Sequence, residues 1–121
     1  PELAKSANAV GMMVIAPEKD GVVRRMPLVV ASDGKLYPSI SMEILRIAAG
    51  DVSFQMKTGI AGVEKLRIPK YKMIDTDAHG NIWLDFKWET PVYPLHEELP
   101  DLKGKIVILS MTASGLLHLW V

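Results

Sequence analysis

Apolar and polar residues alternate along most of this chain in runs of strand length, and one longer stretch has helical spacing. Strands are predicted where apolar or β-branched residues cluster between polar turns. These ranges are Met12 to Ile15, Val22 to Ala31, Val52 to Lys57, Val63 to Ile68, Lys72 to Ile74, Ile82 to Phe86 and Ile106 to Met111. The last range is the most apolar, which predicts a central strand.

The clearest helix is predicted from Ser39 to Ala49. An apolar stripe at helical spacing runs along it, formed by Ile40, Ile44, Ile47 and Ala48. Ser39 is suited to cap the first turn, and Gly50 is suited to end the last. A second, short helix is predicted over Glu2 to Val10.

Tight turns are predicted between the apolar runs, at Asp20-Gly21, Asp33-Gly34 and His79-Gly80. Such turns favour hairpins over repeated strand-helix-strand units. Two hairpins are expected, Met12–Ile15 with Val22–Ala31 and Lys72–Ile74 with Ile82–Phe86. The predicted fold class is α+β, a mixed, largely antiparallel sheet built from hairpins, with one main helix (about 39–49) packed on a face.

The composition limits the classes of function. The 121 residues are 49% hydrophobic, which suits one domain with a core. The 14 basic and 14 acidic residues balance without a dense Lys/Arg cluster, so no nucleic-acid partner is expected. No cysteine is present, which excludes disulfides and thiolate metal sites and leaves the compartment open. Because the chain begins at Pro1 without a signal peptide, we expect a piece of a longer protein.

No metal or cofactor is expected. The three histidines, His79, His96 and His118, lack zinc-like spacing. A loop with Asp75, Asp77 and Asn81 loosely resembles a calcium loop, but the downstream glutamate that such loops require is missing. These polar side chains are therefore expected to stabilise a hairpin loop.

The Thr112–Gly115 loop follows the most apolar predicted strand. Loops at the carboxyl end of a central strand often line ligand crevices, although a simple strand-exit turn is the favoured explanation of this loop. No histidine or acid is tied to Ser114 by the sequence, and no acid–base pair is evident elsewhere. We therefore expect no enzymatic activity.

Arg24 and Arg25 are adjacent on a predicted strand, where neighbouring side chains point to opposite faces. One of them must face the packing layer, or the strand must lie at an edge. A guanidinium keeps its charge and needs an acceptor when buried. The pair is therefore either an anion site or an ion-pair anchor, with Asp20 or Glu43 as the carboxylate.

An ordered set of motifs resembles a known family. The motifs are Asp20-Gly21-Val22-Val23-Arg24-Arg25-Met26-Pro27-Leu28, Leu36-Tyr37-Pro38-Ser39-Ile40-Ser41-Met42-Glu43, the 74–82 segment, Leu102-Lys103-Gly104-Lys105-Ile106-Val107-Ile108-Leu109 and Thr112-Ala113-Ser114-Gly115-Leu116. In this order they resemble the second type of CHASE domain, the sensory module associated with cyclases and histidine kinases. The resemblance covers the chain from about Ala9 onward.

The resemblance implies an extracytoplasmic (periplasmic or extracellular) sensor, membrane-anchored in the full-length bacterial receptor. Its output domain would be a nucleotide cyclase, a histidine kinase, a diguanylate cyclase or a protein kinase. It also implies that residues 1–121 form a single sensor-type domain that is the later part of a larger one. Two positions depart from the family pattern: Ser110 replaces a glycine and His118 replaces an acidic residue.

The sequence is compatible with two functions, which belong to different classes. In the first, the chain senses an unknown small ligand or a periplasmic partner through a ligand-facing cluster of Arg24, Arg25, Tyr37, Thr112 and Ser114. In this cluster a guanidinium would hold an anion and loop amides would complete the pocket. In the second, the chain is a packing or dimerisation module, which would form a homodimer and set receptor geometry without a ligand. The structural alternative for the same side chains is an arginine ion pair and a tyrosine that closes the core.

Overall fold

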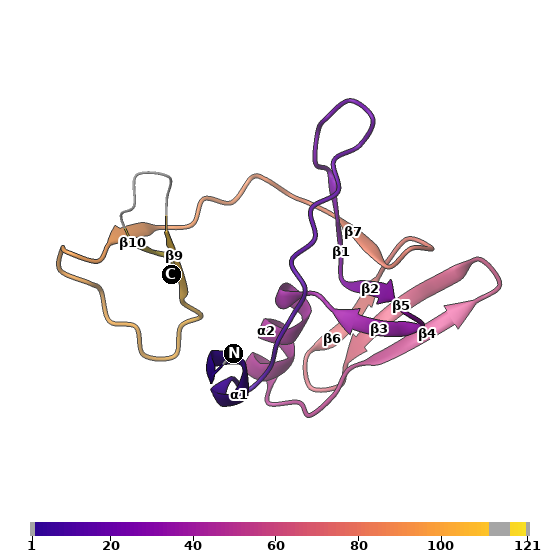
Figure 1. The fold of residues 1–121 in the computed structure, drawn as a ribbon, viewed down its shortest axis with the longest axis horizontal. Helices are drawn as coiled ribbons and strands as arrows, with labels where there is room; N and C mark the ends of the chain where they lie inside the picture. The colour runs from indigo at the N-terminus through magenta and orange to yellow at the C-terminus, as the bar shows by residue number, and fades with distance from the viewer. Residues whose placement is uncertain (1, 112–116, 121) are drawn as a thin grey trace. The chain divides into compact units, whose positions relative to one another are not determined.

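The computed structural model of the chain describes residues 2–111 and 117–120, and it divides the chain into two compact units, Pro1–Leu84 and Asp85–Val121. Each unit is described by itself (Figure 1). The first contains α1 (Glu2–Ser6), β1 (Arg25–Pro27), β2 (Val29–Ser32), β3 (Lys35–Pro38), α2 (Ile40–Ala49), β4 (Gln55–Gly59), β5 (Gly62–Ile68), β6 (Lys72–Asp75) and β7 (Asn81–Trp83). The second contains β8 (Val92–Pro94), β9 (Ile108–Met111) and β10 (Leu117–Trp120). The expectation of a single domain over 1–121 stays a prediction.

The α+β class is confirmed, with every named strand pair antiparallel and α2 as the main helix. The first unit has three small sheets, ordered β1-β7, β2-β3 and β4-β5-β6. The Asp33-Gly34 turn closes the β2-β3 hairpin with both residues at positive φ, 51° and 73°. This backbone twist matches that of the flanking strands, so the turn prediction is confirmed.

The two predicted hairpins, Met12–Ile15 with Val22–Ala31 and Lys72–Ile74 with Ile82–Phe86, are both wrong. Met12 forms an isolated parallel bridge with Ser39, because its N–H donates to the Pro38 carbonyl and its carbonyl accepts from the Ile40 N–H, both at 2.9 Å. β1 instead pairs with β7, and β6 pairs with β5. Strand composition does not identify a partner, and here burial of Ile74 and Ile82 against the core selected the pairing.

The α2 termini agree with the sequence prediction. The Ser39 hydroxyl accepts a hydrogen bond from the Met42 N–H at 3.2 Å, which caps the first turn. Gly50 ends the helix in the left-handed region at φ 72°, and its N–H bonds to the Arg46 and Ile47 carbonyls. Gly11 lies so close to the Ile40 backbone that a Cβ atom would clash there.

The buried face of α2 differs from the predicted stripe. Ile40 and Ile47 are each 43% exposed, whereas Met42 is fully buried and Leu45 and Ala49 pack beside it. Glu43 is also buried, and its carboxylate pairs with Arg46 at 2.6 Å. This internal pairing lets a charged residue face the core, which an apolar pattern cannot anticipate.

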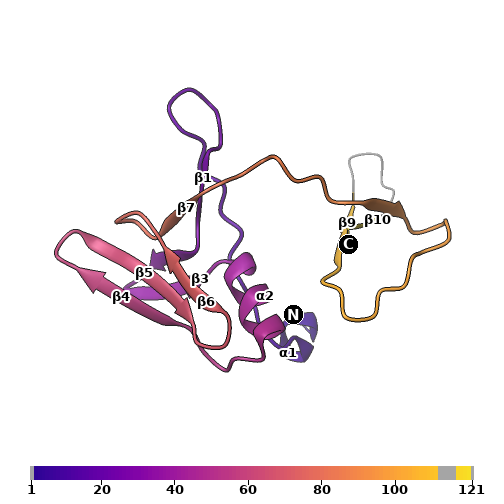
Figure 2. The same cartoon turned by 180° about the vertical axis from the view of Figure 1, so that it is seen from behind.

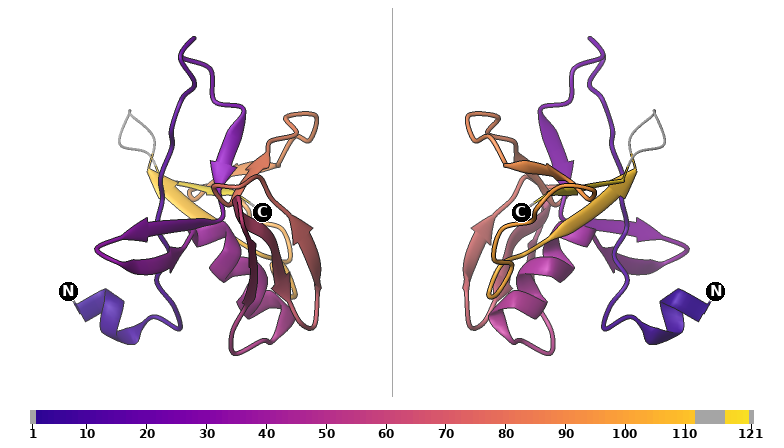
Figure 3. Two further views of the ribbon diagram at one scale, coloured as in Figure 1. Left: turned by 90° about the vertical axis from the view of Figure 1, so that its right-hand side faces the viewer. Right: turned by 90° about the vertical axis from the view of Figure 1, so that its left-hand side faces the viewer.

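The core lies between α2 and one face of the β4-β5-β6 sheet (Figure 3). The fully or nearly buried apolar side chains of the described residues are Leu28, Val29, Met42, Leu66 and Ile68. Met56 and Val63 pack against this cluster from the sheet, and Phe54 packs against it from the residue before β4. A set this small leaves little redundancy, so each buried side chain carries much of the stability of the unit.

The second unit contains one antiparallel sheet in the order β8-β10-β9. The predicted central strand, Ile106 to Met111, is therefore an edge strand, and β10 lies between β8 and β9. Ile108 and Leu109 remain more than half exposed. A continuous apolar run is typical of a strand that is covered on both faces of its sheet. This small sheet does not provide such cover for β9, so the prediction of a buried central strand is wrong.

Candidate functional site

The arginine pair lies at the beginning of β1, directly after a tight turn. Gly21 adopts φ 79° and donates its N–H to the Glu18 carbonyl at 2.8 Å. The Asp20 carboxylate accepts from the Val22 N–H at 3.1 Å, which closes the turn. The turn therefore returns the chain so that Glu18 and Asp20 lie beside Arg24 and Arg25.

Glu18 bridges both guanidinium groups. Its Oε2 atom lies 3.1 Å from Arg24 Nη1, and its Oε1 atom lies 3.2 Å from Arg25 Nε. Arg24 also pairs with Asp20 at 2.7 Å, which confirms one of the two predicted partners, whereas Glu43 pairs elsewhere. The arginine side chains are 41% and 40% exposed, because β1 is an edge strand of a two-stranded sheet. The edge-strand alternative is thus the correct one.

Asp77 ties the same cluster to a loop 52 residues further along the chain. Its Oδ2 atom accepts from Arg25 Nη1 at 3.2 Å and from Asn81 Nδ2 at 3.0 Å. Its Oδ1 atom accepts from the backbone N–H groups of His79 and Asn81, both at 2.9 Å. The Asp77 carboxylate therefore organises the loop, as the sequence predicted, and also anchors Arg25. The Arg25 guanidinium lies 5.4 Å from the centre of the Trp83 ring, a cation–π contact.

These contacts shift the ionisation of the carboxylates. The hydrogen bond from Arg24 and then that from the Val22 N–H lower the pKa of Asp20, and Asp20 in turn raises the pKa of Arg24. Burial raises the pKa of Asp77, but the hydrogen bonds from Asn81, His79 and Arg25 outweigh it and leave the pKa below its ordinary value. Asp20 and Asp77 are thus held in their carboxylate form at neutral pH.

Asp77→Asn is expected to lower the free energy of unfolding at pH 7 by about 1.5 kcal/mol. This value is the lower end of the range for hydrogen bonds to a charged group, because the Asp77 side chain is 26% exposed to solvent. A lowered folded-state pKa adds stability that is present above the unfolded value of about 3.8 and is lost as the pH falls through the folded value. Urea unfolding of both proteins should therefore differ by a constant amount from pH 5 to 8 and converge below about pH 4.

Asp33→Asn provides the matched control. Asp33 is exposed in a turn and has no ion pair within the part of the chain that the structure describes. Its replacement should leave the unfolding free energy nearly unchanged at every pH. A gap between wild type and Asp77→Asn that persisted to pH 2 would show that the contribution of Asp77 does not depend on its charge.

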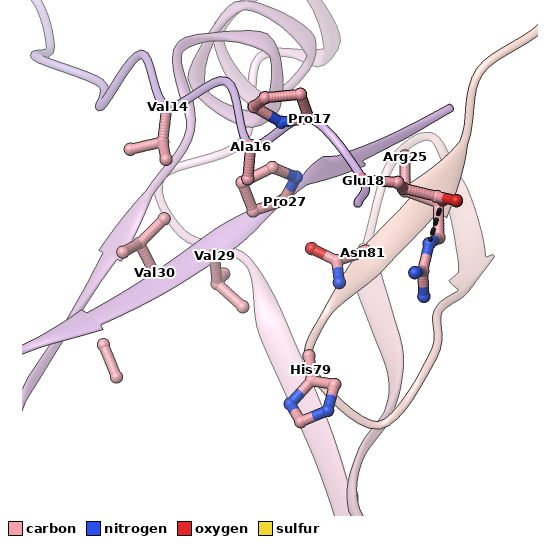
Figure 4. A pocket seen from close by; sticks show the side chains of 11 residues that line it. Val14, Ala16, Pro17, Glu18, Arg25, Pro27, Val29, Val30, His79 and Asn81 are labelled. Carbon is pink, nitrogen blue, oxygen red and sulfur yellow. Dashed lines mark hydrogen bonds and ion pairs between the residues drawn. The ribbon is translucent and has the colours of Figure 1, made fainter. Parts of the chain in front are cut away.

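A cavity of about 420 Å³ lies next to the cluster. Its lining comes from three separated parts of the chain: the segment before the turn, β1 with β2, and the loop after β6. The side chains around it are Val14, Ala16, Pro17, Glu18, Arg25, Pro27, Val29, Val30, Ala31, His79 and Asn81. In Figure 4 the valines and prolines form an apolar wall, and the Glu18–Arg25 pair, Asn81 and His79 form a polar end.

The structure brings together only part of the predicted ligand-facing cluster. Arg25 lines the cavity, whereas Arg24 contacts Glu18 and Asp20 at its rim. Tyr37 lies on β3, is 38% exposed and does not line the cavity. Thr112 and Ser114 lie outside the described residues. A ligand-binding role for these five residues stays a prediction.

Glu18, Asp77 and Asn81 belong to the site but were not predicted as part of it. Glu18 is one of several polar residues in the 17–21 turn, and nothing in the local sequence selects it as the shared acceptor. Asp77 and Asn81 were predicted to stabilise a hairpin loop; they do stabilise the loop after β6, but β6 and β7 do not pair, and the contact of Asp77 with Arg25 spans 52 residues. Such a contact follows from the pairing of β1 with β7. In the described residues, no group of three or more His, Asp or Glu side chains is placed to hold a metal ion.

Comparison with known proteins gives one match. A model of the CHASE2 domain matches residues 1–121 of the chain. Neither the curated proteins nor the solved structures contain a significant match.

Proposed function

The chain belongs to the CHASE2 domain family, whose members are extracytoplasmic sensory modules of membrane receptors, and from this premise we propose that it binds a small ligand and passes its state to a cytoplasmic output domain. A nucleotide cyclase, a histidine kinase, a diguanylate cyclase or a protein kinase would serve as the output. The proposal places the chain outside the cytoplasm and includes no catalytic step. Neither helix in the described part of the chain has the length and hydropathy to cross a bilayer.

The cavity beside the Glu18 cluster is the observation that supports a ligand. Its apolar wall and polar end suit a small molecule with both kinds of surface. Arg25 already contacts Glu18 and Asp77, so an anionic ligand would have to compete with two carboxylates. Because the lining joins segments far apart in sequence, a ligand that prefers one arrangement of them would shift the population toward it.

Thermal shift against a panel of small metabolites tests this proposal. A ligand present at a hundredfold excess over its dissociation constant should add about 2.7 kcal/mol of stability. Ala31→Trp, at an exposed position of the lining, should fill the cavity and abolish the shift. Ala48→Trp, at an exposed position of α2 away from the cavity, should retain it. A ligand shift that survives Ala31→Trp would place the ligand elsewhere.

The second candidate function is a packing or dimerisation module without a ligand. The outward face of α2 favours it, because Ile40 and Ile47 are both substantially exposed. Analytical ultracentrifugation separates the two candidates. Self-association that is lost in Ile40→Ser and Ile47→Ser, together with no thermal shift across the panel, would favour the packing module.

A further inference from the structure

Positive charge is concentrated in the chain segment that forms the β4-β5-β6 sheet and its turns. Between Gln55 and Asp75 the chain has five basic and two acidic residues, a net charge of +3, although the whole chain has 14 of each sign. The basic residues are Lys57, Lys65, Arg67, Lys70 and Lys72, and the acidic ones are Glu64 and Asp75. The chain is therefore neutral as a whole, but this segment is positively charged and attracts anionic partners.

The strand register arranges part of this charge on the outer face of the sheet. Side chains two residues apart share a face, so cross-strand partners form rows. One row holds Lys57, Lys65 and Asp75, and the next holds Gln55, Arg67 and Met73. A hollow of about 360 Å³ lies here, lined by Gln55, Met56, Lys57, Lys65, Arg67 and Met73. The opposite face of the sheet packs on the core through Leu66 and Ile68.

Arg67 occupies the central strand of this face without a counter-ion. Lys57 pairs with Glu64 at 3.0 Å and Lys65 pairs with Asp75 at 3.3 Å. Within residues 2–111 and 117–120, the Arg67 side chain makes no hydrogen bond or ion pair, although its backbone pairs with β4 and β6. A guanidinium presents a planar fork of donors that matches phosphate oxygens, and this one is free to bind them.

An exposed apolar residue lies at the end of the same sheet. Ile60 is fully exposed at the tip of the hairpin that joins β4 to β5, three residues after Lys57. Figure 2 shows this hairpin extending beyond α2. An apolar tip flanked by basic side chains is suited to the interface of an anionic bilayer, where the tip enters the headgroup layer and the cations contact phosphates.

We propose that the outer face of the β4-β5-β6 sheet docks on an anionic phospholipid surface. Lys57, Lys65 and Arg67 contact lipid phosphates, and Ile60 inserts among the headgroups. This inference goes beyond the proposed ligand function and uses none of the cavity residues. It draws on the family only because a module of a membrane receptor is held near a bilayer, where tethering raises the effective concentration of a weak site.

Vesicle co-sedimentation of the 121-residue chain tests the proposal. Mixed phosphatidylcholine and phosphatidylglycerol vesicles should bind the chain, more weakly as salt rises, whereas pure phosphatidylcholine vesicles should not. The combined variant Lys57→Gln, Lys65→Gln and Arg67→Gln should lose at least roughly tenfold in affinity, since each cation near the surface contributes. Ile60→Ser should weaken binding as well, without altering the net charge.

A second triple variant, Lys87→Gln, Lys103→Gln and Lys105→Gln, removes the same charge from residues 85–121 and should bind as wild type does. Equal losses in the two triple variants, or equal binding to both kinds of vesicle, would overturn the proposal. So would stabilisation by inorganic phosphate without vesicle binding, which would indicate a site for a free anion. Circular dichroism shows whether each variant is folded, and Ala31→Trp should bind vesicles normally whatever the outcome at the cavity.

Discussion

Leu66→Ala is expected to lower the free energy of unfolding of the 1–84 unit by about 3–5 kcal/mol. Leu66 lies on β5, the central strand of its sheet, and has no exposed surface. Truncation removes buried methyl groups and leaves a cavity that the surrounding strands cannot collapse to fill. The core cluster contains few other buried side chains, so little remains to compensate.

Urea unfolding followed by circular dichroism measures this effect. Leu36→Ala is the matched control, because Leu36 lies on β3 and is 51% exposed. The same chemical change there should cost less than about 1 kcal/mol. Similar losses for both variants would mean that the packing of the β4-β5-β6 sheet on α2 contributes little to stability.

Gly62→Ala is expected to lower the free energy of unfolding by about 1.5–3.5 kcal/mol. Gly62 has φ 124°, a conformation that a Cβ atom penalises by about 1–2 kcal/mol. A Cβ atom would also collide with the Ala78 carbonyl oxygen, which accepts the Val63 N–H at 3.0 Å. Relief of the collision would break that bond, which adds about 0.5–1.5 kcal/mol.

Gly34→Ala separates the two causes, because Gly34 also has positive φ, 73°, but has open space around the Cβ position. It should show the conformational cost alone. If Ala78 moves away to relieve the collision in Gly62→Ala, the neighbouring Asp77 should also move relative to Arg25. Asp77→Asn should then lower the free energy of unfolding by less in the Gly62→Ala background than in wild type. If the losses in the free energy of unfolding of the two substitutions are additive, the conformation at Gly62 does not affect the contact between Asp77 and Arg25.

Local features of the fold were predictable from sequence. Ser39 and Gly50 cap the two ends of α2, and Asp33-Gly34 closes the β2-β3 hairpin. Both features were predictable because caps and tight turns depend on residues a few positions apart. The pairing of β1 with β7 was not predictable. Several strands of similar composition competed for each partner, and burial of Ile82 and its neighbours decided between them.

Some residues of the candidate site were likewise predictable from sequence and others were not. Adjacency on a strand was enough to single out Arg24 and Arg25 as charges in need of acceptors. Asp20 was within reach as a local partner, four residues away. Glu18 was not distinguishable as the shared acceptor, and Asp77 approaches Arg25 only through the β1-β7 pairing.

The amino-acid sequence was sufficient to identify the family, the α+β class, the main helix and the two arginines as charges that need acceptors, because these depend on short-range spacing and on an ordered set of motifs. The tertiary structure was needed to show that carboxylates from two distant segments pair with the arginines, that a cavity lies beside them and that Lys57, Lys65 and Arg67 share one sheet face. Each of these depends on contacts between segments far apart in the chain, and such contacts are selected by burial and strand register together.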